Sequence, residues 1–160
     1  MIAASARAHS TAFYSPEEVE AAIAHVFGVD SELVADGSYL VAEWAGTLAG
    51  CGGWSRRPTL FGGDRFAARA TGVLSPARDA ARIRAFFVAP GHDRRGVASA
   101  LLASCEAAAA QAGFSRTALM STLPGVRFYE RHGYVAEPAI THVCGTTPVG
   151  FVPMSKLLLK

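Results

Sequence analysis

The chain has 160 residues, of which 51% are hydrophobic and 18% charged, and its formal net charge is +2 at pH 7. This length is typical of one domain, and the low charge excludes a disordered tail, a coiled coil and a basic nucleic-acid-binding surface. No apolar run is long enough to span a bilayer, and no signal peptide is visible at the N-terminus. We therefore expect a single cytoplasmic domain over residues 1–160, with neither membrane nor nucleic acid as a partner.

The cysteines and histidines are scattered along the chain. Cys51, Cys105 and Cys144 do not form a disulfide framework, and no Cys or His pair has the spacing of a metal site. We expect no metal cofactor. Cys51 and Cys105 are interpreted as small core residues, because the sequence shows no charged partner that would lower the pKa of either thiol.

The first half of the chain predicts a helix followed by a β-hairpin. Ser15-Pro16-Glu17-Glu18 is a strong helix start, with serine as N-cap and proline at the first position, and Gly28 is expected to end that helix. Residues 38–44 and 47–54 are predicted to be paired strands. Three glycines in the second strand indicate that its backbone approaches another group closely. Residues 56–80 lack periodicity and predict a long loop, which often carries function.

The second half alternates between strands and helices. The pattern predicts a strand over 81–88, an alanine-rich helix over 96–111, a strand over 114–120, a short helix from Pro124 to about His132, and final strands over 134–144 and 151–158. This order of elements favours an α/β domain with a mixed sheet over an alternating doubly wound one.

One connection between a strand and a helix has the character of a phosphate site. It reads Val88-Ala89-Pro90-Gly91-His92-Asp93-Arg94-Arg95-Gly96-Val97-Ala98. A helix start exposes unpaired N–H groups and the positive end of the helix dipole, which suit a phosphate. Arg94 and Arg95 add positive charge, while the small Gly96 and Ala98 leave room. An ordinary turn with two solvated arginines is the alternative, and this segment alone does not decide between them.

A second segment, Pro124-Gly125-Val126-Arg127-Phe128-Tyr129-Glu130-Arg131-His132-Gly133-Tyr134, follows one strand later. Together the two segments resemble the GNAT superfamily of acyl-CoA-dependent N-acetyltransferases. The first is similar to the pyrophosphate loop of that family, Val-x-Pro-x-x-Gln/Arg-x-x-Gly-x-Gly/Ala, and the second to its Phe-Tyr-Glu-x-x-Gly-Phe segment. The resemblance implies an α/β (α+β) fold with a mixed, mainly antiparallel central sheet flanked by helices.

The resemblance also implies acetyl-CoA as the cosubstrate. Backbone N–H groups from Arg94 through Ser99 would hold its pyrophosphate, with the two arginines beside the phosphates, and the end of the preceding strand would pair with the pantetheine arm. The implied cofactor-binding residues are Phe86, Phe87, Val88, Arg94, Arg95, Gly96, Val97, Ala98 and Ser99.

The implied reaction is direct attack of a neutral amine on the thioester. Tyr129 would donate a proton to the departing thiolate, because the pKa values of a phenol and a thiol are close. The alternative for Tyr129 is a core aromatic whose hydroxyl finds a backbone partner. A base must also accept the proton of the amine, and Glu43 on the first hairpin strand is the candidate, with His92 as a weaker one.

The acceptor pocket is expected near the end of the hairpin. Trp54 would form a wall of this pocket, and Arg56 would bind an acidic group on the acceptor. A buried tryptophan beside an exposed arginine is the equally simple alternative. The acceptor itself is expected to be a small-molecule or peptide amine of unknown identity, and the chain is expected to be a monomer or a homodimer.

Two features depart from the family pattern. Asp93 occupies the Gln/Arg position of the loop, where an acid beside phosphates is unfavourable unless it caps the helix or turns outward. Residues 1–14 are similar to the end of the first family helix without a strand ahead of it, so either the chain starts late or the usual first strand is missing, and both alternatives leave a sheet edge less protected.

Two other functions compete with acetyl transfer. A non-catalytic CoA-binding regulatory module on the same fold would explain Asp93 and the lack of a clear base. A nucleotide-phosphate binder of another α/β fold is disfavoured, because the sequence contains neither GxGxxG nor GxxxxGK[ST].

Overall fold

The computed structural model describes residues 1–66 and 69–159 of the chain. Its helices are α1 (Ile2–Ser10), α2 (Pro16–His25), α3 (Ser31–Ala35), α4 (Val97–Gln111) and α5 (Val126–Arg131), with a 3-10 turn η1 (Leu123–Gly125). Its strands are β1 (Tyr39–Trp44), β2 (Thr47–Ser55), β3 (Ala81–Val88), β4 (Arg116–Thr122), β5 (Val135–Ala136), β6 (Ile140–Cys144) and β7 (Thr147–Leu157). The order of elements matches the expected one apart from the extra helices before the hairpin.

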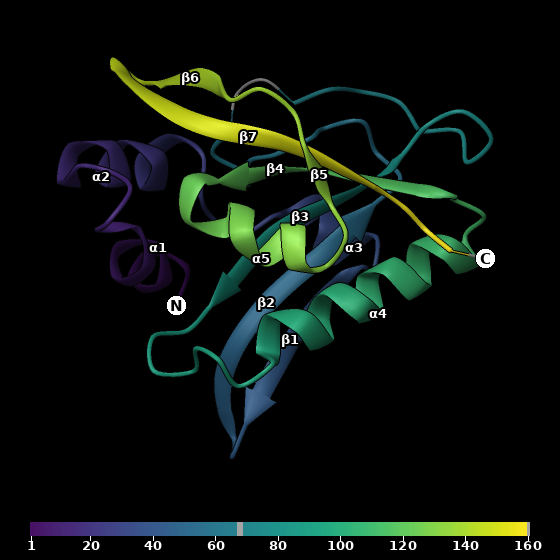
Figure 1. Cartoon of the computed structure of the whole chain (residues 1–160), viewed down its shortest axis with the longest axis horizontal. Coiled ribbons are helices and arrows are strands. Elements are labelled where there is room, and N and C mark those ends of the chain that lie inside the picture. The colour runs from purple at the N-terminus through teal and green to yellow at the C-terminus, as the bar shows by residue number, and fades with distance from the viewer. Residues whose placement is uncertain (67–68, 160) are drawn as a thin grey trace.

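The described strands form one seven-stranded sheet in the order β1-β2-β3-β4-β7-β5, with β6 also paired to β7 (Figure 1). Of these pairings, only β3 with β4 is parallel. The expected mixed, mainly antiparallel sheet is therefore confirmed.

Helix α2 begins where the sequence predicts. The Glu18 N–H donates to Ser15 Oγ at 3.2 Å, and the Ser15 N–H donates to Glu18 Oε2 at 2.7 Å, which completes a capping box. The helix ends at His25, three residues before the expected stop at Gly28.

The strand expected over residues 134–144 is broken in two. Pro138 lies between β5 and β6, and proline has no N–H with which to continue a ladder of hydrogen bonds. Both pieces pair with the same long strand, with Val135 opposite Ser155 and Ile140 opposite Phe151. Strand β7 is correspondingly longer than predicted, because it must accept both.

Alternating residues of β7 divide the core between the two faces of the sheet. Val149 and Phe151 pack with α1 and α2, whereas Val152 and Met154 pack with α4 and α5. Figure 1 shows α4 and α5 in front of the sheet, whereas α1 and α2 lie at the left of the view and farther from the viewer. A cavity that contacts both clusters must therefore pass through the sheet.

The glycines of β2 are close to other groups, as expected. A Cβ on Gly52 would lie 2.6 Å from a carbon of the Phe86 ring, and one on Gly50 would lie 2.8 Å from Val97 Cγ1. No real Cβ tolerates such distances, so these glycines let β3 and α4 pack directly against the β2 backbone.

Strand β1 is the edge of the sheet, and within the described residues no strand precedes it. The side chains of Val41 and Trp44 on this strand are 60% and 46% exposed. These exposed side chains agree with the expectation of a less protected sheet edge.

Candidate active site

A gap opens in the middle of the sheet between β3 and β4. These strands pair only at Ala81 with Thr117 and at Arg82 with Ala118, and they are not paired farther along. Because they run in the same direction, the opening lies at their carboxyl ends, where a ligand can reach the backbone of both.

A bulge at Ala85 changes which side chains of β3 face each side. The β2–β3 register shifts between Cys51 and Gly53, and Ala85 has a φ of 58°, an unfavourable conformation for a residue with a Cβ. Ile83 and Phe86 consequently both pack on the α4 side, while Phe87 packs with the α1 and α2 cluster. One strand thus contributes aromatic rings to both faces.

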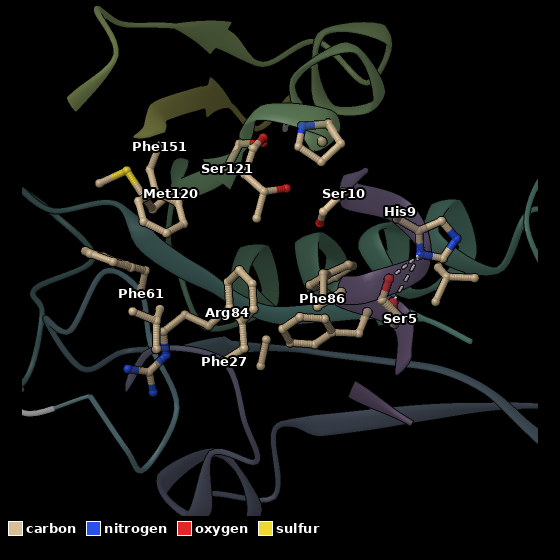
Figure 2. Close-up of a pocket in the computed structure, with 18 of the residues that line it drawn as sticks. Ser5, His9, Ser10, Phe27, Phe61, Arg84, Phe86, Met120, Ser121 and Phe151 are labelled. Carbon is tan, nitrogen blue, oxygen red and sulfur yellow. Dashed lines mark hydrogen bonds between the residues drawn. The ribbon is translucent and has the colours of Figure 1, made fainter. Parts of the chain in front are cut away.

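A cavity of about 470 Å³ occupies this gap (Figure 2). Residues 83–88 of β3 and 120–122 of β4 form its sides. Tyr129 of α5 lines it from one face of the sheet, and Phe27 and Phe151 line it from the other. It therefore connects the two faces through the sheet.

The N-terminus of α4 adjoins the cavity and has free hydrogen-bond donors. In the described part of the chain, the backbone N–H groups from Arg94 through Ser99 have no hydrogen-bond acceptor, and no side chain caps the helix. Gly96 has a φ of 79°, and a Cβ placed on it would meet nothing within 4 Å. The first turn of α4 is thus open on the side where an anion would bind.

Asp93 was expected either to cap the helix or to turn outward. The N-cap of α4 is Gly96, so Asp93 does not cap the helix. Its carboxylate instead forms an ion pair with His9 Nε2 from α1. The other ring nitrogen, Nδ1, lies 2.9 Å from the Ser5 carbonyl oxygen. Both ring nitrogens therefore face acceptor oxygens, which leaves neither of them free for a ligand.

Tyr129, the residue expected to act as the acid, faces the cavity. It is 9% exposed, lines the cavity, and has no hydrogen-bond partner among the described residues. Burial raises the pKa of its phenol, so the hydroxyl stays protonated at neutral pH. Tyr134, by comparison, donates to Glu106 at 2.9 Å and contacts Thr117 Oγ1 at 2.9 Å. Tyr134 is a satisfied core residue, whereas the hydroxyl of Tyr129 is available to a ligand.

A third tyrosine positions the segment that carries Tyr129. The Tyr14 hydroxyl accepts a hydrogen bond from the Leu123 N–H at 2.9 Å and donates one to the Gly150 carbonyl at 2.6 Å. It thereby joins the start of η1 to β7. Burial raises the pKa of Tyr14 to about 12, so this bridge is intact at neutral pH.

The residues expected to bind the cofactor are brought together. Phe86, Phe87, Val88 and Ala98 line the cavity. Arg94, Arg95, Gly96, Val97 and Ser99 form the adjoining loop and the first turn of α4. The Val97 side chain is buried against Ala49 and Leu101, so only its backbone faces the loop.

Three other expected residues lie elsewhere. Glu43 is exposed on β1, and two strands, β2 and β3, lie between it and the gap. Trp54 packs against Phe114 at 6.3 Å, near the end of β3 that is still paired with β4, and Arg56 lies over its ring at 6.0 Å. None of these three lines the cavity, because β2 leads away from the open end of the sheet. The weaker candidate His92 does not line it either.

The cysteines are buried as expected. Burial raises the pKa of Cys51, and it raises that of Cys105 to about 12. Neither thiol is a thiolate at neutral pH. Within residues 1–66 and 69–159, no group of three or more His, Cys, Asp or Glu side chains is arranged to share a metal ion, and no helix is long and apolar enough to cross a membrane.

The model of the acetyltransferase (GNAT) family matches residues 4–134. The chain belongs to this family. The match covers both segments on which the resemblance rests, the pyrophosphate loop and the helix that carries Tyr129. Among curated proteins, no match to the chain is found.

Solved structures of GNAT proteins share its fold at low sequence identity. The GCN5-related N-acetyltransferase of Rhodopseudomonas palustris is 21% identical, with a TM-score of 0.70 over 98% of this chain and 85% of that one. The PaiA N-acetyltransferase of Thermoplasma acidophilum, solved with coenzyme A, is 16% identical, with a TM-score of 0.60 over 98% and 88%. An acetyltransferase of Salmonella typhimurium, solved with its cofactor acetyl-CoA, is 15% identical, with a TM-score of 0.58 over 81% and 70%.

The sequence alone did not identify several of the residues that form the cavity. His9 comes from α1, Phe27 from the segment after α2, Phe61 from the long loop and Phe151 from β7. The acid in the phosphate loop was a signal that a cationic partner was needed, but it did not indicate which one. The aromatic residues carried no signal, because each is equally compatible with an ordinary core.

Proposed function

We propose that this protein transfers an acetyl group from acetyl-CoA to an amine of a small molecule or peptide, within a single ternary complex. The observation that carries the proposal is the cavity through the sheet, which joins the free N–H groups of α4 to the phenol of Tyr129. Membership of the GNAT family and the CoA complexes of structural relatives support the same reaction.

In this proposal, the first turn of α4 binds the pyrophosphate through the N–H groups of Arg94 to Ser99. Gly96 fits this role, because its left-handed backbone and missing side chain leave the N–H groups open. Arg94 and Arg95 contribute positive charge beside the phosphates. The pantetheine arm then follows β3, where residues 86–88 line the cavity.

The chemistry is attack of the amine nitrogen on the thioester carbonyl, followed by cleavage of the C–S bond. The Ala89 N–H donates to the Ala49 carbonyl in β2 at 2.8 Å, so the N–H of Val88, one residue earlier, points to the other side of β3, into the gap. In the proposal this N–H stabilises the oxyanion. Tyr129 donates its proton to the departing thiolate, which leaves as the thiol of CoA.

The amine enters the reaction in its neutral form. Glu43 is remote from the gap, and both ring nitrogens of His9 face acceptors, so neither side chain is arranged as a base. The proposal therefore takes the neutral amine directly from solution. The proton released after attack passes to water.

The test separates binding from transfer. Calorimetry with acetyl-CoA is expected to show binding by the wild type and equally by Tyr129→Phe. Release of CoA thiol with a panel of amines is expected to fall at least about tenfold in Tyr129→Phe, because general acid catalysis of this kind contributes about 10²–10⁴-fold.

Two results would contradict the proposal. A folded protein that does not bind acetyl-CoA is not an acetyltransferase. A protein that binds acetyl-CoA but transfers to no amine is instead a CoA-binding regulatory module. Unchanged turnover in Tyr129→Phe would remove Tyr129 from the mechanism while leaving the reaction in place.

A further inference from the structure

The half of the cavity that faces α1 and α2 is lined by aromatic and thioether side chains. We call this surface the aromatic wall, and it consists of Phe27, Phe61, Phe87, Met120 and Phe151. Its rings form a continuous set of edge and tilted contacts: Phe27 lies 5.5 Å from Phe87 and 6.4 Å from Phe151, and Phe61 lies 5.4 Å from Phe151. Figure 2 shows Phe61, Met120 and Phe151 of this group at one end of the cavity and His9 and Ser5 at the other.

The aromatic wall is held in place by neighbouring backbone. Phe61 belongs to the long loop, which is tied to the segment after α2 by hydrogen bonds from the Gly63 N–H to the Val26 carbonyl at 2.8 Å and from the Asp64 N–H to the Val29 carbonyl at 3.0 Å. A Cβ on Gly63 would lie 2.7 Å from the Gly28 carbonyl oxygen, so only glycine permits this approach. The wall is therefore formed before any ligand arrives.

No charged group is available to a ligand at this wall. The charged residues of the described chain that line the cavity are His9, Arg84 and Asp93. His9 and Asp93 form an ion pair with each other at the opposite end.

Arg84 does not supply a free charge either. Its side chain is 0% exposed, and it forms ion pairs with Asp30 at 3.2 Å and Glu32 at 3.4 Å; its Nε has no hydrogen-bond partner among the described residues but is buried like the rest of the side chain. Arg69 pairs with the same two acids and balances their charge. A second ammonium or a carboxylate on the acceptor would consequently lose its hydration without gaining a partner.

We infer that the acceptor is a monoamine whose substituent is apolar, with an aromatic ring as the best fit. This inference rests on the proposed function, because it assigns the aromatic wall to the amine that attacks the thioester. Burial of apolar area contributes about 25 cal/mol per Å², and aromatic pairs add about 0.5–1.5 kcal/mol beyond that area. Diamines, polyamines and free amino acids are excluded as good acceptors.

The test uses two pairs of amines that differ by one charge. n-Butylamine is compared with 1,4-diaminobutane, which adds an ammonium, and 2-phenylethylamine with phenylalanine, which adds a carboxylate. Rates are expressed per neutral amine. The member of each pair without the additional charged group is expected to have a kcat/KM at least about tenfold higher, since an unpaired polar group costs about 1–3 kcal/mol. 2-Phenylethylamine is expected to be the best of the four.

A charge placed in the wall should reverse this preference. Phe61→Asp is expected to favour 1,4-diaminobutane over n-butylamine, whereas Val73→Asp, at a site that is 70% exposed in the same loop, is expected to keep the wild-type order. If Phe61→Asp does not fold, as judged by its melting temperature, Phe61→Ser is the replacement. It is expected to lose turnover of 2-phenylethylamine selectively.

The outcomes distinguish this inference from the proposed function. Transfer to a diamine or amino acid that equals transfer to its uncharged partner overturns the inference and leaves the acetyltransferase intact. The inference is also overturned if the Phe61 variants change the choice between acetyl-CoA and hexanoyl-CoA but not the choice of amine, since the wall would then hold the acyl chain. Calorimetric binding of 2-phenylethylamine to the CoA complex tests the wall even if no transfer occurs; lack of binding there overturns it.

Discussion

In the proposed function, the two ends of the cavity recognise their ligands by different means. At the loop end, from Arg94 to Ser99, the donors are backbone N–H groups fixed by one short segment, and side chains matter little. At the aromatic wall, recognition depends on side chains from the segment after α2, from β3, β4 and β7, and from the long loop, while the backbone only supports them. The comparison indicates that the cosubstrate end is determined locally, whereas the acceptor end can change through substitutions in several separate elements.

The sharpest expected effect is that of pH on transfer. Because none of the described side chains that line the cavity is arranged as a base, kcat/KM is expected to rise about tenfold per pH unit below the pKa of the amine, which for an alkylamine is about 10. Burial raises the pKa of Tyr129, so its acid form is not lost over this range and no alkaline decline occurs below about pH 10. A pH–rate profile with 2-phenylethylamine measures this slope.

A plateau near neutral pH would mean that a protein group accepts the proton. The control is the affinity for acetyl-CoA, measured over the same range, which should change little. An affinity for acetyl-CoA that does not change with pH would confine the pH effect to the acceptor end of the cavity.

The next largest effect is expected at the loop end. Gly96→Val should weaken acetyl-CoA binding at least about tenfold, because its side chain would occupy the open side of the turn and its φ of 79° is strained for valine. Calorimetry checks the affinity. Gly91→Val is the matched control, since Gly91 also has a positive φ, 83°, with open space around it, but lies before the helix start.

Both valine variants should lose similar stability to backbone strain. Equal loss of acetyl-CoA affinity in the two would contradict a specific role for the first turn of α4. Binding of 2-phenylethylamine to the wall should remain in both variants, which is what independence of the two ends requires.

A smaller effect is expected from the ion pair between α1 and the phosphate loop. His9→Ala leaves the Asp93 carboxylate uncompensated beside the phosphates and should weaken acetyl-CoA binding by about threefold to tenfold, as for a partly exposed charge. Asp93→Asn in the same chain should restore the affinity. A double-mutant cycle by calorimetry measures the coupling.

Additive effects in that cycle would show that His9 acts on its own. The same variants should not alter the ranking of amines, because His9 lies at the opposite end from Phe61 and Phe151 of the aromatic wall (Figure 2) and Asp93 is paired with His9.

The smallest effect is expected from the bridge between η1 and β7. Tyr14→Phe removes two hydrogen bonds and should lower the free energy of unfolding by about 1–3 kcal/mol, since it leaves a buried N–H or carbonyl unpaired. Denaturant unfolding measures this loss. In folded protein at a temperature well below the transition, kcat should fall more than acetyl-CoA affinity, because η1 positions Tyr129 and not the phosphate loop.

The sequence predicted the parts of the fold that depend on neighbouring residues. The capping box at Ser15, the strand over 81–88 and the helix carrying Tyr129 all follow from local signals. The single strand over 134–144 was wrong because Pro138 interrupts the hydrogen-bond ladder.

The residues of the site also fall into those that local sequence predicts and those that it does not. The loop residues could be predicted because one segment contains them all, whereas Phe27, Phe61 and Phe151 are brought together only by the packing of three distant segments. Trp54 and Arg56 lie at the end of the hairpin, where the acceptor pocket was expected. The direction of β2 carries them away from the gap between β3 and β4. Such directions follow from the sheet as a whole and not from any local pattern.

The bulge at Ala85 shifts the alternation of side chains along β3 by one residue. Before it, odd-numbered residues such as Ile83 face α4, and after it the even-numbered Phe86 does. A strictly alternating β3 that kept Ala85 in a regular ladder would place Phe87 on the α4 face and Phe86 on the opposite face. The two rings would exchange faces, so a single inserted residue keeps Phe86 in the helical core and Phe87 in the aromatic wall.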